Sequence, residues 1–150
     1  DMPPGTGDIQ LTLAQQVPTT AALIVTTPQD VALADARKGI AMFNKVNVPV
    51  LGIVENMSYH VCSARGHHEA LFGTGGGKKM AEQYQVALLG QLPLHIDIRQ
   101  HMDDGCPTVF GSPEGGLAEA YLKLARRVGA ELYFSGKPIA TPLYTVALDE

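Results

Sequence analysis

The feature that most restricts the fold is an alternation of short apolar runs with segments of helical periodicity. Residues 21–26, 50–54 and 86–90 are apolar runs of strand length, which is typical of strands buried on both faces. Between the first two runs apolar residues recur on one helical face, and we expect Asp30 to cap that helix. A short helix is expected over residues 78–84. Strand, helix, strand, helix and strand in this order predict a parallel sheet with right-handed crossovers.

A last helical stripe is expected to cover this sheet. Apolar residues three or four positions apart form it, namely Leu117, Tyr121, Leu124, Val128 and Leu132, and charged residues oppose them. The fold class is therefore α/β, with a mostly parallel sheet and helices on both faces. Residues 137–150 contain two prolines and are expected to form an extended tail.

The composition argues against several classes of function. Of the 150 residues, 45% are apolar and 17% are charged, and the formal net charge is -4. Because no basic cluster is present, we expect no nucleic-acid partner. No apolar run approaches the roughly 20 residues that span a bilayer, so we expect no membrane association and a cytoplasmic location. Two cysteines, Cys62 and Cys106, do not make a disulfide framework.

The first eight residues, DMPPGTGD, have the composition of a nucleotide-hydrolysis site. Asp1 is followed by Pro and by two glycines, Gly5 and Gly7. Such a strand end could hold a Mg²⁺-bound water and turn sharply beneath a terminal phosphate. In this interpretation the Gly5 and Gly7 amides lie near the γ-phosphate, and Asp8 is a switch carboxylate. The alternative is an ordinary Pro-Gly turn flanked by aspartates.

Two segments are expected at the carboxyl ends of the strands, where parallel α/β sheets bind their ligands. Asn56 follows the run 50–54, and Pro93, Leu94 and His95 follow the run 86–90. Both segments fall where a purine ring could lie. The alternative for Asn56 is a strand terminated by a side-chain turn.

The glycine-rich run GTGGGKK, residues 73–79, resembles a phosphate-binding loop but fails the pattern G-x-x-x-x-G-K-[ST]. Phe72 stands at the first glycine position and Lys79 at the Ser/Thr position. We therefore do not assign the ATP site to this run. It could still bind an anion at a helix N-terminus, or act as a hinge for the loop that carries Cys62.

Taken together, residues 1–8, 26–30, 52–58 and 62–77 resemble the Mrp/ApbC family of P-loop ATPases, which carry iron-sulfur clusters and are related to MinD. The resemblance runs over nearly the whole chain and implies that residues 1–150 are the carboxyl-terminal portion of one P-loop ATPase domain, with the phosphate loop upstream. It further implies ATP and Mg²⁺ as cofactors, with Asp1 holding Mg²⁺ through a bound water. In the related ATPases an Asn in the position of Asn56 reads the adenine edge, and the loop around Pro93 packs against the base.

The resemblance also implies a homodimer that passes a cluster to apo iron-sulfur proteins. Family members carry Cys-x-x-Cys here, and two such pairs from two subunits hold one four-iron four-sulfur cluster. This chain has Cys62, but Arg65 stands at the second position, and Arg cannot act as a ligand. Four alternatives follow. His67, His68 or Glu69 supplies the missing ligand, or cluster binding is weakened or lost. Otherwise Cys62 and a histidine from each subunit bind zinc, or the loop is solvated with a free thiol. The broader alternative is a non-catalytic binding or dimerisation fragment.

Overall fold

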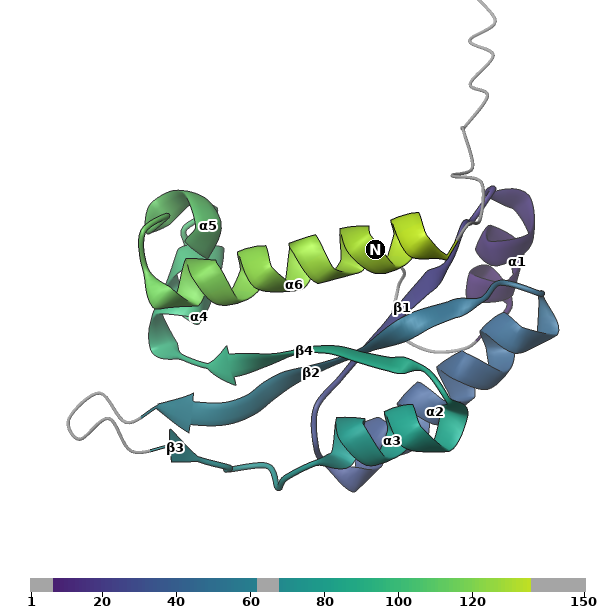
Figure 1. Cartoon of the computed structure of the whole chain (residues 1–150), viewed down its shortest axis with the longest axis horizontal. Coiled ribbons are helices and arrows are strands. Elements are labelled where there is room, and N and C mark those ends of the chain that lie inside the picture. The colour runs from purple at the N-terminus through teal and green to yellow at the C-terminus, as the bar shows by residue number, and fades with distance from the viewer. Residues whose placement is uncertain (1–6, 62–67, 136–150) are drawn as a thin grey trace, which may run out of the picture.

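The computed structural model describes residues 7–61 and 68–135, so Asp1, Gly5, Cys62 and the tail predicted at 137–150 lie outside the described residues. The described part is a four-stranded sheet with helices on both faces (Figure 1). The strands are β1 (Ala22–Thr26), β2 (Val50–Val61), β3 (His68–Glu69) and β4 (Ala87–Leu94). The helices are α1 (Asp8–Gln16), α2 (Asp30–Lys45), α3 (Gly76–Tyr84), α4 (Ile96–Asp103), α5 (Thr108–Gly111) and α6 (Gly116–Phe134). None of the helices within the described ranges is both long and apolar enough to cross a membrane.

The long strand β2 lies at the centre of the sheet. It pairs in parallel with β1 on one side and with β4 on the other, and its far end pairs antiparallel with the two residues of β3. The three predicted strands are confirmed as β1, β2 and β4, and the mostly parallel sheet is confirmed with them. Both β2 and β4 extend beyond their apolar runs because the residues that follow the runs, such as Tyr59 and His60 of β2 and Pro93 and Leu94 of β4, still pair. As a result Pro93 and Leu94 belong to β4, whereas we expected them in a loop after it.

Two helix starts differ from the predictions. Asp30 is the first residue of α2, and the cap is Gln29, whose carbonyl accepts the Leu33 amide at 2.9 Å. The expectation that Asp30 caps this helix is therefore wrong, although its carboxylate in the first turn still suits the helix dipole. Helix α3 begins at Gly76 and not at residue 78, because its amino end packs into the protein interior, against Glu55 and Pro28.

The sheet separates two apolar cores. Helices α2 and α3 cover one face, where buried Leu33, Ile40, Ile53 and Met80 belong to the larger core. Helix α6 covers the other face over β2 and β4, where Val54, Leu89 and Leu92 form a smaller core. The predicted stripe of α6 is half-buried, and its residues Tyr121, Leu124 and Val128 pack against this second core. Burial raises the pKa of Tyr121. The covering helix expected from the sequence is thus confirmed.

We expect Ile53→Ala to be strongly destabilising. The Ile53 side chain is fully buried in the larger core, on the strand that pairs with both β1 and β4, so truncation leaves a cavity that rigid neighbours cannot close. Urea unfolding should show a loss of about 3–4 kcal/mol with an unchanged m-value. Val31→Ala on exposed α2 surface is the control and should change stability by less than about 0.5 kcal/mol. A loss below about 1 kcal/mol for Ile53→Ala would contradict the packing described for the core.

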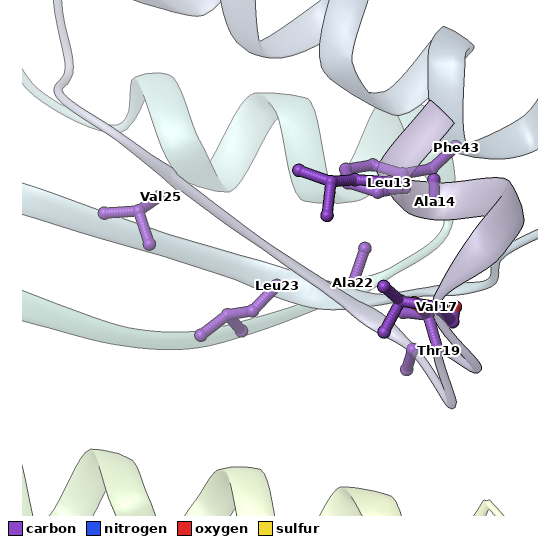
Figure 2. Close-up of a pocket in the computed structure, with 9 residues that line it drawn as sticks. Leu13, Ala14, Val17, Thr19, Ala22, Leu23, Val25 and Phe43 are labelled. Carbon is purple, nitrogen blue, oxygen red and sulfur yellow. Dashed lines mark hydrogen bonds between the residues drawn. The ribbon is translucent and has the colours of Figure 1, made fainter. Parts of the chain in front are cut away.

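Within the described part of the chain, strand β1 has a strand partner on one edge only, and its other edge is free. Apolar side chains of β1 are exposed beside this free edge. Its burial alternates, with Ala22, Ile24 and Thr26 buried while Leu23 and Val25 are 38% and 58% exposed. Beside it lies a groove of about 610 Å³ that α1, β1 and Phe43 of α2 line (Figure 2). Leu13 and Val17 enter this groove from the α1 side. An apolar strand edge of this kind is a template for pairing with further chain.

Candidate functional site

Asn56 lies in a bulge in the middle of β2. Glu55 of β2 is opposite Gln91 of β4, and the next paired residues are Tyr59 and Pro93. Three residues of β2 therefore face a single residue of β4. Met57, in the middle of the three, has a φ of 53°, a left-handed conformation that non-glycine residues rarely adopt. The bulge removes Asn56 and Met57 from the ladder with β4.

The side chain of Asn56 is held by its own backbone. Its Oδ1 atom accepts the amide hydrogen of Met57 at 2.9 Å, and the residue is half-buried. The amide nitrogen and the second lone pair of Oδ1 remain for a ligand. The alternative from the sequence, a side-chain turn that ends the strand, is not found, because the bond reaches only the next residue and β2 continues to Val61. The bond is compatible with base binding because it uses only one position of the amide.

Asn56 lines an open groove of about 440 Å³ between β1 and α2. Thr26 and Thr27 from the carboxyl end of β1 line it, together with Asp35 of α2. The groove lies beside the open edge of β1, and its lining is mixed polar and apolar. It has the chemistry to receive a planar, partly polar group.

Pro93, Leu94 and His95 lie at the opposite edge of β2. Pro93 and Leu94 pair with Tyr59 and His60, and they are absent from the lining of the groove that holds Asn56. His95 caps α4, where its Nδ1 atom accepts the Asp97 amide at 3.2 Å. The structure thus places Pro93, Leu94 and His95 at the carboxyl end of β4, but Asn56 lies in the middle of β2 and does not follow the strand as we expected. The two segments do not line one groove.

At the amino end, Gly7 caps α1 and Asp8 is the exposed first residue of that helix. Gly7 has a φ of -80°, which any residue can adopt, and a Cβ atom there would make only an ordinary contact of 3.5 Å with Gln10. The backbone of this structure therefore does not require glycine at position 7. The glycine leaves the amino end of α1 open, and helix N-termini of this kind attract anions.

The glycine-rich run at the amino end of α3 donates a backbone hydrogen bond to a side-chain carboxyl group of the same chain. The Gly77 amide donates to Oε2 of Glu55 at 2.6 Å, and Glu55 is completely buried. A Cβ atom at Gly77 would lie 2.9 Å from that oxygen, and one at Gly76 would lie 2.7 Å from the carbonyl oxygen of Pro28. Close packing thus explains both glycines. The carboxyl group of Glu55 thus lies at the helix N-terminus where we considered a bound anion. Lys78 and Lys79 are exposed to solvent.

Glu55 accepts two further hydrogen bonds at its other oxygen. Ser58 Oγ donates to Oε1 at 2.6 Å and Gln91 Nε2 donates to it at 2.8 Å, while Gln91 also donates to Ser58 Oγ at 2.9 Å. Our sequence reasoning missed this network. The available signal was a glutamate at the end of an apolar strand, since carboxylates are almost never fully buried without partners.

The loop with Cys62 begins where β2 and β3 stop pairing. His60 pairs with Glu69 and Val61 with His68, and the rings of Tyr59 and His68 stack with centroids 5.3 Å apart. These contacts hold Val61 and His68, the described residues before and after 62–67, side by side. Among the described residues no three His, Cys, Asp or Glu side chains gather as a metal site; Cys62, Arg65 and His67 lie outside them, so the ligand alternatives remain predictions.

Comparison with known proteins adds a family, relatives and structures. The family model described as ParA, NUBPL iron-transfer P-loop NTPase, matches residues 1–129. The iron-sulfur cluster carrier protein of Haemophilus influenzae is 63% identical over 143 residues, which cover 95% of this chain and 39% of that protein. The chain thus spans about two fifths of the length of such curated relatives.

Two solved structures are similar to the described fold. A nucleotide-binding protein from Archaeoglobus fulgidus, solved in complex with ADP, has a TM-score of 0.65 and 36% identity, and the match covers 79% of this chain and 47% of that one. The cell division ATPase MinD of Pyrococcus furiosus has a TM-score of 0.58 and 28% identity, with 74% and 43% covered.

Proposed function

This chain belongs to the family of NUBPL-type iron-transfer P-loop NTPases, and from that premise we propose that it forms the base-binding and cluster-binding portion of an ATP-dependent iron-sulfur cluster carrier that acts as a homodimer. One observation carries the proposal. The single strand β2 holds Asn56 at its bulge and ends at Val61, directly before Cys62. A conformational change caused by nucleotide binding at Asn56 could therefore be transmitted along β2 to the segment that carries Cys62.

The proposed roles are those that the resemblance to the Mrp/ApbC family implies. Asn56 reads the adenine edge, and Pro93, Leu94 and His95 pack near the base from the neighbouring strand end. The amides of Gly5 and Gly7 approach the γ-phosphate at the amino end of α1, Asp1 positions a Mg²⁺-bound water and Asp8 acts as the switch carboxylate. Cys62 is the cluster ligand from each subunit. The cluster is cargo, delivered to apo iron-sulfur proteins in the cytoplasm.

The residues fit a nucleotide only in part. Asn56 offers a free amide nitrogen in an open groove, but no G-x-x-x-x-G-K-[ST] pattern occurs in the 150 residues. The chain spans 39% of its Haemophilus influenzae relative, and we propose that a preceding part of the same domain carries the phosphate-binding lysine, as the resemblance to the Mrp/ApbC family implies. We call this chain preceded by that part the extended protein.

We expect the chain alone to show no ATPase turnover, because the lysine and amides that hold the β- and γ-phosphates are missing. The extended protein should release phosphate from Mg²⁺-ATP. In it, Asp1→Asn should lower kcat about 10- to 100-fold, as expected for a group that orients a metal-bound water. Asp104→Asn, the same change at an exposed turn, should leave the rate unchanged.

The ATPase assay also tests the alternative function, a non-catalytic binding or dimerisation fragment. The absence of a phosphate-loop pattern from the 150 residues is the observation that favours this alternative. If the extended protein is folded but neither binds nor hydrolyses ATP, the carrier ATPase is refuted and the fragment is favoured. Turnover by the chain alone that survives Asp1→Asn would refute our site assignment.

A further inference from the structure

The buried carboxylate of Glu55 lies directly beneath the bulge that presents Asn56. It receives three hydrogen bonds, from the Gly77 amide, from Ser58 Oγ and from Gln91 Nε2, at 2.6, 2.6 and 2.8 Å. In a regular strand, residues three apart point to opposite faces. Here the side chains of Glu55 and Ser58 meet because the bulge adds residues between them. The Glu55–Ser58 bond therefore exists only when the bulge is formed.

The bulge in turn sets the orientation of the Asn56 amide. Within the bulge the Met57 amide donates to Oδ1 of Asn56 at 2.9 Å, and Met57 itself has a left-handed φ of 53°. A flipped amide would put the NH₂ group against that hydrogen, so the bond selects one of the two orientations. Oδ1 keeps a second lone pair and Nδ2 keeps its hydrogens for a ligand.

The selected orientation matters for base choice. An Asn amide pairs with the N6 and N7 atoms of adenine through one acceptor and one donor. Guanine presents O6, an acceptor, where adenine presents an amino group, so a fixed Oδ1 repels guanine. An amide that is free to flip would lose this discrimination.

We propose that Glu55 is a positioning residue for base selectivity. With Ser58, Gln91 and Gly77 it closes the bulge of β2 and so holds the backbone amide of Met57 in place. That amide fixes the side-chain amide of Asn56 in the orientation that favours adenine over guanine. This inference rests on the proposed function, since it deepens the role given there to Asn56. Glu55 itself is buried and does not touch the nucleotide.

The test compares ADP with GDP binding in the extended protein, by competition against a ribose-labelled fluorescent ADP. Glu55→Met removes both acceptor oxygens at similar side-chain length. Glu119→Met makes the same change on the exposed face of α6, where the side chain is 62% exposed and pairs with Lys123. The double variant Glu55→Gln/Gln91→Glu exchanges the two groups. The new amide at position 55 can then accept from Gly77, while the new carboxylate at position 91 accepts from Ser58 and from that amide.

Wild type and Glu119→Met should prefer ADP by about tenfold or more, the discrimination of a bidentate base contact. In Glu55→Met the preference should fall to within about threefold, and the exchange variant should regain most of it. If Glu55→Met does not fold, as judged by circular dichroism, Glu55→Gln alone is compared with the exchange variant. A folded Glu55 variant that keeps the full preference for ADP would overturn the inference and leave the proposed function intact. Wild type that binds both nucleotides equally would also overturn the inference, whereas wild type that binds neither would refute the proposed function itself.

Discussion

Arg65→Cys should convert a chain that binds little iron-sulfur cluster into one that binds it stably. Cluster ligation needs thiolates, and at the position of the Cys-x-x-Cys motif a homodimer of this sequence offers only Cys62 from each subunit. Arg65, three positions after Cys62 in the sequence, supplies no ligand, because its guanidinium has no acceptor. The substitution restores the Cys-x-x-Cys spacing, so four thiolates become available to a dimer.

The measurement is the visible absorbance and iron content of both proteins after anaerobic reconstitution with iron and sulfide and desalting. We expect Arg65→Cys to retain at least about tenfold more iron than the unchanged chain, because two thiolates cannot complete the coordination of a four-iron cluster. Arg99→Cys, a surface position on α4, controls for iron bound by any added thiol. A full cluster in the unchanged chain would show that His67, His68 or Glu69 supplies the missing ligand.

The second large effect concerns the free edge of β1. We expect the 150-residue chain to self-associate, because Leu23 and Val25 remain exposed beside an apolar groove and one edge of β1 has no strand partner among the described residues. The partner we expect is a second copy of the chain. The double variant Leu23→Lys/Val25→Lys should weaken association about a hundredfold, since two charges replace apolar contacts on each copy.

Sedimentation velocity at tens of micromolar checks this expectation. Leu122→Lys makes the same kind of change at a leucine that is exposed on α6, and this control should associate like the unchanged chain. A monomeric unchanged chain would show that the edge of β1 is protected. Equal association of the double variant and the unchanged chain would place the contact elsewhere on the surface.

The large elements could be predicted from the sequence because each carries a strong periodic signal. The apolar runs predicted β1, β2 and β4, and the stripe from Leu117 to Leu132 predicted α6. The resemblance to the iron-sulfur carriers, read from short motifs, is confirmed by the family match and the relatives.

What could not be predicted depends on tertiary contacts. The cap at Gln29 and the early start of α3 follow from packing that no local pattern encodes. The bulge around Asn56 is defined by the pairing of β2 with β4, in which three residues of β2 face one residue of β4. That pairing is not encoded in the local sequence of β2. Helices α4 and α5 are short and have weak periodicity, so nothing in the sequence pattern singled them out.

The contact between Gly77 and Glu55 has a consequence for how this family can change over time. A methyl group at position 77 would press on the carboxylate oxygen, so neither position is free to vary by itself. An alanine at 77 becomes tolerable when a shorter acid at 55 draws the carboxylate back. Across homologues we therefore expect these two positions, 22 residues apart in sequence, to covary, with glutamate found beside glycine and aspartate beside alanine.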